Sequence, residues 1–586
     1  MTGPQSAWFP ALLVGSALCG QEAPSLHPEL AAHTAHFAKK VYRVGANVYS
    51  AVGWSLANVI MIEGDSGIII VDTGELDTNP EVLAEFRKVT SKPVVAVIYT
   101  HFHPDHISGA RSFVSPDEAR SGKVAIIAHE DLLKNVQNQA GTIGPILGVR
   151  SSYSFGAGTT PEEAKGMNYG LGAAMRSASS SFIPPTRTFR DQLDITLAGV
   201  RFQLVHVPSE APDEIAVWLP EQRVLLSAEV VQGPCFPNIH TLRGTHYRDP
   251  VQWFRSLDRL RRFNAEHMAP AHGQPVFGAA RVEEVLRMYR DAIQFVHDQT
   301  VRHMNRGLTP EELVDVVRLP PHLDQFQPYL RQYYGTVSHS VRQIYHGYLG
   351  WFEGDPATLD PTPRAERARR TVTLMGGRER VLAEARKVLD GGDDRWAVEL
   401  STHLIRVDPD DSDARRLKAR AFRRLAYASM NTNWRSWYLV AAHELEGTLD
   451  TAALQRRSQA RFSSPDLIAA LPARAWVEGH ATRLRSERTL DVHLTAGFRF
   501  PDINEAYGLE IRRGIAQFHE SLPARCDLTL TLDKRVLDRV LLGEIKLAEA
   551  VSSGAMRVNG GRAAEVERFF GFFEAPFETP IKLTLR

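Results

Sequence analysis

Thr100-His101-Phe102-His103-Pro104-Asp105-His106 directly follows a β-branched run at residues 94–99, and this stretch decides the fold. The run predicts a buried strand, so the polar stretch begins where that strand ends. Three histidines and one aspartate fall within six residues there, and imidazole and carboxylate groups are ligands that zinc accepts. Such a loop can turn His101 and His103 toward one ion, and Asp105 and His106 toward a second. The stretch therefore predicts a metal site.

Apolar segments on both sides of the histidine stretch alternate with segments of helical character. Residues 57–62 and 67–71 are apolar runs separated by Gly64-Asp65-Ser66-Gly67, which is a hairpin signal. Further strands are expected in close succession at residues 200–207, 215–219 and 223–227. This alternation predicts an α/β domain around the metal site.

The histidine stretch, together with Asp72-Thr73-Gly74 after the apolar run, resembles the metallo-β-lactamase superfamily. The resemblance implies an αββα fold and a hydrolase with two metal ions, and the family's chain order locates the remaining ligands. Val207-Pro208-Ser209-Glu210 carries glutamate where the common family has histidine. A second glutamate, Glu229, stands where the common family has aspartate after the next strand, and His272 supplies the last ligand.

The resemblance thus implies a complete ligand set for two Zn²⁺ per chain. His101, His103 and Glu210 would hold one ion, Asp105, His106 and His272 would hold the other, and Glu229 would bridge them. Asp213 and Glu214 are alternatives to Glu210, whereas His206 lies on a strand and is expected to pack in the sheet. Ligand types alone do not distinguish zinc from manganese or iron.

The departure from the common pattern points to one subfamily. Ser209-Glu210-Ala211-Pro212 followed by Ala228-Glu229 is similar to the alkyl sulfatases, and the resemblance continues through residues 238–244, 248–249, 374–377 and 395–400. It implies hydrolysis of a small amphiphilic alkyl sulfate to an alcohol and inorganic sulfate. Two alternatives remain open: another two-metal hydrolase of this fold, acting on a lactone, phosphodiester or thioester, or a lipid-binding protein with a vestigial metal site.

An alkyl sulfate has a tetrahedral monoanionic head, which needs cations and fixed hydrogen-bond donors. Arg243 offers a planar, always-charged fork, and Asn238 offers an amide donor, so the resemblance implies that both hold the sulfate. His246, three residues after Arg243, is a candidate acid for the leaving oxygen. Tyr153 and Tyr169 are candidate substrate contacts. The segment Gly244-Thr245-His246 looks closer to secondary, inverting alkylsulfatases than to primary ones, and attack at sulfur or at carbon stays open.

The rest of the chain indicates a multidomain protein. Residues 381–429 carry apolar residues at helical spacing, including Leu382, Ala385, Val388 and Leu389. Residues 490–494, 526–532 and 581–585 alternate like half-buried strands, while 534–541 and 563–572 look helical. The Gly/Ser-rich stretch 135–185 is expected to form a lid.

With the resemblance, we expect these units: an N-terminal arm or signal segment at 1–40, the αββα metallo-β-lactamase-fold catalytic domain at 41–280, an all-α dimerisation domain at 281–455 that forms a homodimer, and an α+β sterol-carrier-protein-like domain at 460–586.

Composition excludes several partners. The 586 residues hold 68 Lys and Arg against 68 Asp and Glu, and this zero net charge gives no reason to expect nucleic acid binding. No stretch reaches the roughly 20 apolar residues of a membrane span.

Residues 11–18 resemble a short signal segment, but no Lys or Arg precedes them, which leaves cytoplasmic and exported locations open. Cys19, Cys235 and Cys526 form no CxxC pair, so a thiolate metal site is not expected.

Overall fold

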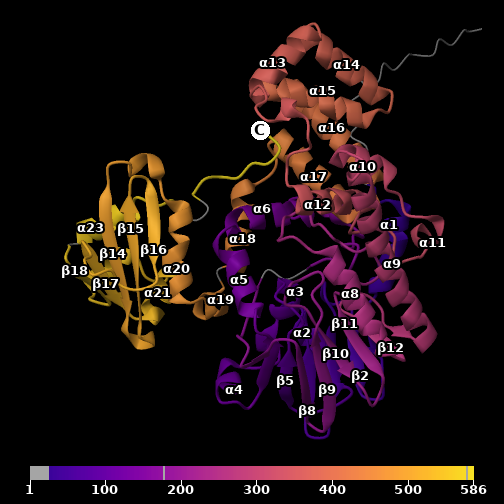
Figure 1. The fold of residues 1–586 in the computed structure, drawn as a ribbon, viewed down its shortest axis with the longest axis vertical. Helices are drawn as coiled ribbons and strands as arrows, with labels where there is room; N and C mark the ends of the chain where they lie inside the picture. The colour runs from indigo at the N-terminus through magenta and orange to yellow at the C-terminus, as the bar shows by residue number, and fades with distance from the viewer. Residues whose placement is uncertain (1–24, 176–178, 463, 562, 576–577, 586) are drawn as a thin grey trace, which may run out of the picture.

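The computed structural model describes residues 25–175, 179–462, 464–561, 563–575 and 578–585, arranged as a β-rich region, a helical region and a separate α+β region (Figure 1). The signal-like segment expected at residues 11–18 lies outside the described residues. The multidomain architecture expected from the sequence is confirmed.

Two sheets form the centre of the β-rich region. The first has seven strands in sequence order: β1 (Lys40–Arg43), β2 (Val48–Val52), β3 (Val59–Glu63), β4 (Ile68–Val71), β5 (Val94–Ile98), β6 (Ala125–His129) and β7 (Arg187–Phe189). The second has six, in the order β13 (Val276–Phe277), β12 (His267–Pro270), β11 (Val224–Ala228), β10 (Ile215–Leu219), β9 (Val200–His206) and β8 (Gln192–Leu197). The six strands expected around the metal stretch are all present.

Alternating side chains on these strands bury both faces of each sheet. On β4, Ile69 and Val71 face the second sheet, where they meet Val217 and Leu226. Ile68 and Ile70 point the other way, into a core that includes Phe86 of α2 (Asn79–Arg87). The outer face of the second sheet packs on α8 (Pro250–Arg261) and α9 (Ala279–Met304). The resulting helix–sheet–sheet–helix order is the expected αββα arrangement.

The stretch expected as a lid is more regular than its composition indicates. It contains α5 (Leu132–Gly141), α6 (Gly144–Ser154) and α7 (Pro161–Ala164). Pro161 begins α7, where Thr160 and Glu163 form a capping box, so a local sequence signal sets the start of this helix. Helix α6 packs on the helical region, which gives the weakly periodic stretch the apolar contacts that it lacks by itself.

The helical region consists of short antiparallel neighbours: α10 (Pro310–Val316), α11 (Pro321–Asp324), α12 (Val337–Leu349), α13 (Arg364–Leu374), α14 (Arg378–Asp390), α15 (Asp394–Val407), α16 (Ser412–Ala428) and α17 (Thr432–Glu446). Leu382, Ala385 and Leu389 line one face of α14 and meet Leu400 and Leu417. The helical spacing expected for residues 381–429 is therefore confirmed as a packed core.

The C-terminal region is built on a five-stranded sheet in the order β16 (Ile515–His519), β15 (Glu505–Arg512), β14 (His493–Phe500), β17 (Leu528–Leu532) and β18 (Met556–Asn559). Its helices are α20 (Ala473–Gly479), α21 (Lys534–Leu541), α22 (Leu547–Ser552) and α23 (Ala563–Phe570). The strand expected at 490–494 begins only at His493, because Leu490 lies in an exposed turn.

The strand expected at residues 581–585 is wrong. This segment joins no sheet, because Ile581 and Leu583 pack against α6 and α17 instead of pairing with β-strands. Alternation of apolar and polar residues is also satisfied by an extended segment that lies on helices, and it does not by itself require a sheet partner.

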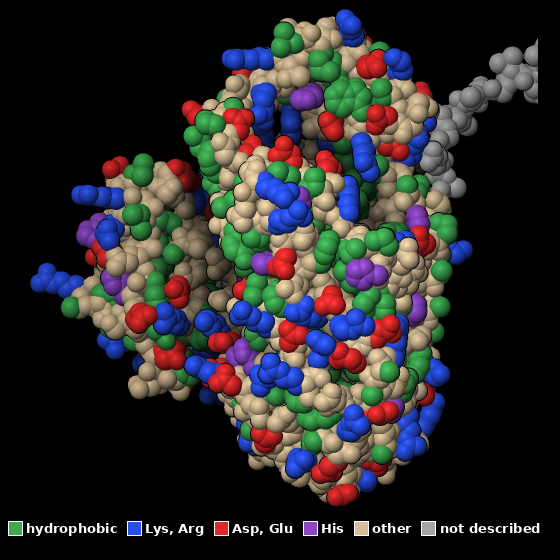
Figure 2. All heavy atoms as spheres, turned by 45° about the vertical axis from the view of Figure 1, so that its right-hand side comes forward, with side chains coloured by type: hydrophobic (Ala, Val, Ile, Leu, Met, Phe, Trp, Pro, Cys, Tyr) green, Lys and Arg blue, Asp and Glu red, His purple; other side chains and the backbone are tan. Residues whose placement is uncertain are grey.

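The surface agrees with the neutral composition. On the face shown in Figure 2, Lys and Arg side chains are interspersed with Asp and Glu and form no continuous basic patch. Among the described helices, none is both long enough and apolar enough to cross a bilayer.

The packing of the C-terminal region is testable at Phe498, which is fully buried on β14 against Phe569. Replacing it with alanine leaves a cavity, so Phe498→Ala should lower the free energy of unfolding of this region by about 3–5 kcal/mol. Denaturant unfolding of the full chain measures the change. Ile515→Ala, at a half-exposed position, is the control and should change stability by no more than about 0.5 kcal/mol.

Candidate functional site

The histidine stretch is fixed to the end of the first sheet by a buried aspartate. Asp72 follows β4, and its carboxylate accepts hydrogen bonds from the backbone N–H and the hydroxyl of Thr100, both at 2.8 Å. Asp72 has a left-handed φ of 55°, which turns the chain out of the strand. Pro104 then begins the short helix α3 (Pro104–Ile107), which carries Asp105 and His106 on one turn.

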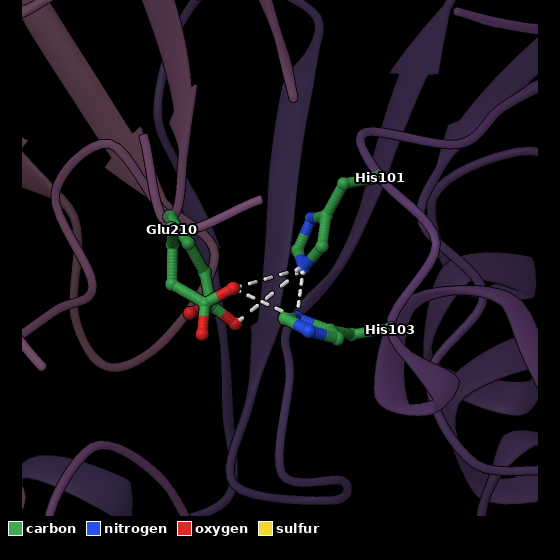
Figure 3. A group of neighbouring side chains, drawn as sticks. His101, His103 and Glu210 are labelled. Atoms are coloured by element: carbon green, nitrogen blue, oxygen red, sulfur yellow. Dashed lines mark hydrogen bonds and ion pairs between the residues drawn. The ribbon is translucent and has the colours of Figure 1, made fainter. Parts of the chain in front are cut away.

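The first cluster gathers His101, His103 and Glu210 (Figure 3). His101 Nε2 lies 2.9 Å from His103 Nδ1, and His103 Nδ1 lies 2.8 Å from Glu210 Oε2. The distance from His101 Nε2 to Glu210 Oε2 is 3.9 Å. These side chains come from the ends of β5 and β9, one in each sheet, and all three are buried.

The second cluster is centred on Glu229, which directly follows β11. Glu229 Oε1 lies 2.9 Å from His106 Nε2 and 2.8 Å from His272 Nε2. Asp105 Oδ2 lies 3.4 Å from His106 Nε2 and 3.8 Å from His272 Nε2. Glu229 Oε1 is also 3.9 Å from His101 Nε2, so the two clusters share this carboxylate.

The donor set fits a pair of metal ions. In each cluster the candidate ligand atoms lie within 4.8 Å of one another, and all are imidazole nitrogens or carboxylate oxygens. Glu210 Oε2 is buried without hydrogen-bond geometry to any described residue, although His103 is close to it. Burial alone would raise the pKa of Glu229, but the charges and hydrogen bonds of His272 and His106 hold it well below its usual range. The carboxylate therefore stays ionised.

Outer contacts orient the three histidines that present Nε2 to the cluster centres. His106 Nδ1 lies 2.7 Å from Asp72 Oδ2, and His272 Nδ1 lies 2.8 Å from the carbonyl oxygen of Leu56. His101 Nδ1 lies 3.1 Å from the hydroxyl of Thr100. A hydrogen bond at Nδ1 fixes the tautomer whose Nε2 lone pair faces a metal ion.

Buried polar partners hold the two glutamates. The guanidinium of Arg248, which is 1% exposed, donates to Glu210 Oε1 and, at 2.5 Å, to the carbonyl oxygen of Asn238. Gln232 donates to Glu229 Oε2 at 2.8 Å. Each glutamate thus has one oxygen fixed by the protein and the other directed toward the histidines. The sequence analysis assigned no role to Arg248 or Gln232, because neither residue type at these positions by itself indicates a buried partner for a glutamate.

The residues expected to bind sulfate lie beside this centre. Arg243 is buried, with Nη2 at 3.5 Å from His103 Nε2. Asn238 is also buried, and its amide nitrogen has no hydrogen-bond partner among the residues that the structure describes. A cation and an unused donor in a buried position are what a sulfate group requires.

The alternative ligands stay outside both clusters. Glu214 accepts hydrogen bonds from the hydroxyl of Ser209 and the backbone N–H of Glu229, and Asp213 is buried apart from the histidines. Burial raises the pKa of Asp213 to about 7. His206 packs against His129, with ring centroids 4.1 Å apart, as expected for a residue in the sheet.

Three further candidates are placed less directly. His246 is solvent-exposed, but partial loss of hydration and the positive charge of Arg248 lower its pKa to about 4, so the ring is neutral near pH 7. Tyr153 is fully buried, and its hydroxyl donates to Glu444 of α17. In this position the hydroxyl of Tyr153 is already bonded within the chain. Tyr169 packs on Phe155, with ring centroids 5.1 Å apart.

Comparison with known proteins decides the family. Three family models match: metallo-beta-lactamase superfamily at residues 52–272, alkyl sulfatase dimerisation at 309–448 and alkyl sulfatase C-terminal at 461–579. A linear primary-alkylsulfatase from Pseudomonas sp. is 56% identical over 530 residues, which are 90% of this chain and 100% of the relative. The chain belongs to the alkyl sulfatase family.

More distant alkyl sulfatases share both sequence and architecture. An (R)-specific secondary-alkylsulfatase from Pseudomonas sp. is 31% identical over 91% of this chain and 81% of its own length. The solved structure of the stereoselective inverting sec-alkylsulfatase Pisa1 from Pseudomonas sp. superposes with a TM-score of 0.84 at 30% identity, covering 93% of this chain and 86% of that one. Both primary and secondary enzymes therefore occur among the relatives.

Removing one carboxylate tests whether Glu210, and not a neighbouring acidic residue, is a metal ligand. We expect Glu210→Gln to weaken binding of one metal ion by more than about 100-fold, since outer contacts alone are worth roughly 10–100-fold. The metal content of the purified variant, measured after dialysis against a weak chelator, should fall by one ion per chain. Asp213→Asn, three residues along the same loop, is the matched control and should retain the wild-type content. Equal loss in both variants would contradict the assignment of Glu210.

Proposed function

We propose that this alkyl sulfatase hydrolyses alkyl sulfate esters with two Zn²⁺ per chain, and that Arg243 and Asn238 hold the sulfate. The observation that carries the proposal is the pair of buried clusters that share Glu229 beside the buried guanidinium of Arg243. His101, His103 and Glu210 would hold one ion, Asp105, His106 and His272 the other, and Glu229 both.

The chemistry follows from charge and burial. Zinc held by these residues would supply the charge that lowers the pKa of a water molecule, so that hydroxide would be available near neutral pH. Arg243 binds the sulfate oxygens as a charge-assisted fork, and Asn238 supplies its unused N–H donor. Arg248 donates to Oε1 of Glu210, and this contact keeps the carboxylate ionised and in place. The burial of these groups excludes bulk water, which strengthens each contact with the anion.

The leaving group distinguishes two routes. Attack at sulfur expels an alkoxide, which needs a proton, whereas attack at carbon expels sulfate, which needs far less help. His246, in the same loop as Arg243, is the candidate proton donor to the ester oxygen on the first route. Hydrolysis in ¹⁸O-labelled water assigns the route: label in the sulfate means S–O cleavage, and label in the alcohol means C–O cleavage.

For the substrate class, we propose linear primary alkyl sulfates. The segment Gly244-Thr245-His246 favours secondary esters, but the relative that is 56% identical over 90% of the chain is named a linear primary-alkylsulfatase, and the secondary enzyme is 31% identical. Sulfate release from dodecyl sulfate and 2-octyl sulfate, with and without chelator, compares the two classes directly. A higher kcat/KM for 2-octyl sulfate would reverse this assignment.

We also propose that the chain is a homodimer joined through the helical domain, with domain boundaries near residues 280 and 455–460. This domain matches the alkyl sulfatase dimerisation family and exposes large apolar side chains, among them Leu374 at 88% and Trp351 at 66% exposure. Apolar residues so exposed on a helical surface favour burial against a second copy. Light scattering of the purified protein should give twice the chain mass of 65.3 kDa.

Arg243 provides the sharpest test of the sulfate site. Arg243→Ala removes a charge-assisted contact with the anion, so kcat/KM for dodecyl sulfate should fall by roughly 100-fold or more, while zinc content stays unchanged. Arg190→Ala, an exposed arginine on the same domain, is the control and should behave like the wild type. An Arg243→Ala enzyme with wild-type kcat/KM would show that the sulfate is held elsewhere.

A further inference from the structure

The segment that fails to form a strand, residues 578–585, makes a specific set of contacts away from its own domain. The yellow trace leaves the C-terminal sheet and returns to the helical region near α17 (Figure 1). Gln455 of α18 (Thr451–Phe462) donates to the carbonyl oxygen of Thr579 at 3.0 Å. Ile581 and Leu583 then pack into one apolar cluster with Val149 and Tyr153 of α6.

A single buried carboxylate binds this segment and α6 together. Glu444 of α17 accepts hydrogen bonds from three consecutive backbone N–H groups, those of Leu583 at 3.0 Å and of Thr584 and Leu585 at 2.9 Å. The same carboxylate accepts a hydrogen bond from the hydroxyl of Tyr153. Burial and the charge of Glu444 raise the pKa of Tyr153, so its hydroxyl stays protonated as a donor. A buried carboxylate needs such donors, and successive backbone amides are well suited to supply them.

Helix α6 carries a second polar contact one turn earlier. Arg150 donates from Nε to the carbonyl oxygen of Arg243 at 2.8 Å and from Nη2 to that of Leu242 at 2.5 Å. Its guanidinium also lies over the ring of Trp437, 5.4 Å from the centroid, and Trp437 donates to the hydroxyl of Ser154 at 2.9 Å. Arg150 is therefore held by α17 and bonds to the backbone from which the side chain of Arg243 extends.

The loop that carries Arg243 depends on such outside contacts. Residues 238–249 form no helix or strand, and Gly244 has a φ of 101°. No regular backbone hydrogen-bond ladder therefore fixes the carbonyl groups of Leu242 and Arg243. Where a binding group is displaced by about 1 Å, a rate loss of the order of 100-fold follows. A donor that holds two consecutive carbonyl groups removes that freedom.

We propose that residues 579–585 act as a strap which, through Glu444, Tyr153 and Arg150, sets the position of Arg243 and hence the affinity for the sulfate group. Arg150 is a positioning residue in this arrangement, and Arg243 is the residue that touches the substrate. The inference rests on the proposed function, in which Arg243 holds the sulfate.

The test measures sulfate affinity in the full-length metal-loaded enzyme. Arg150→Ala should raise both the KM for dodecyl sulfate and the inhibition constant of inorganic sulfate by roughly 10-fold, with zinc content unchanged. Arg150→Lys, which can bond to one carbonyl, should give a smaller rise. Tyr153→Phe and a chain ending at Lys582 should shift the same two constants in the same direction. Arg190→Ala is the matched arginine control.

Combination with Arg243→Ala shows whether Arg150 acts through Arg243. We expect Arg150→Ala to cause no further loss when Arg243 is already alanine. Independent, additive losses would overturn the inference, as would wild-type inhibition constants for sulfate in Arg150→Ala and in the shortened chain. If Arg150→Ala loses zinc or fails to fold, Arg150→Lys and Tyr153→Phe decide the matter, and wild-type constants in both overturn it. Wild-type activity in Arg243→Ala alone would instead contradict the proposed function.

Discussion

One carboxylate oxygen in the buried interior faces three imidazole rings, and the catalytic domain is organised around that contact. Glu229 Oε1 lies within 3 Å of His106 Nε2 and His272 Nε2 and 3.9 Å from His101 Nε2. Burying an ionised carboxylate without compensation is costly, and the charges and hydrogen bonds of His106 and His272 offset part of that cost. Divalent cations held by these residues would offset more of that cost, which would couple stability to metal binding.

The two sheets meet at this carboxylate. The histidine loop follows β5 and Asp72 follows β4 in the first sheet, whereas Glu210, Glu229 and His272 follow β9, β11 and β12 in the second. Apolar residues between the sheets, such as Val71 and Leu226, hold their ends in register. A ligand set drawn from both sheets is correct only if the sandwich closes correctly. The apolar core between the sheets thus determines where these side chains lie.

The family resemblance was enough to predict which seven side chains converge, because its chain order places each of them after a strand. The supporting residues could not be predicted in this way. Arg248 reaches Glu210 across 38 positions, and nothing in its neighbourhood marks it as buried. Residues 581–585 alternate like a strand, yet three of their backbone N–H groups bind Glu444, more than 130 positions away. Tyr153 looked like a lid residue, and its hydroxyl is also used by Glu444. Local sequence patterns show the periodicity and polarity of a segment, but they do not show which distant residue fixes a side chain.

Arg243 and Arg248 lie five residues apart in one loop and have opposite electrostatic environments. Arg248 is fully buried, and its charge is already balanced by Glu210. Arg243 is nearly as buried, but within the described part of the chain no carboxylate lies at ion-pair distance from it. If His103 held an ion through Nδ1, its Nε2 would carry the proton and could not accept a hydrogen bond from Arg243, which would leave the guanidinium available to an anion. A tetrahedral monoanion at that position completes the charge balance, whereas a neutral ester does not. Under the proposed function, selection of a sulfate ester over a neutral substrate would follow from the fact that Arg248 has a carboxylate partner and Arg243 has none among the described residues.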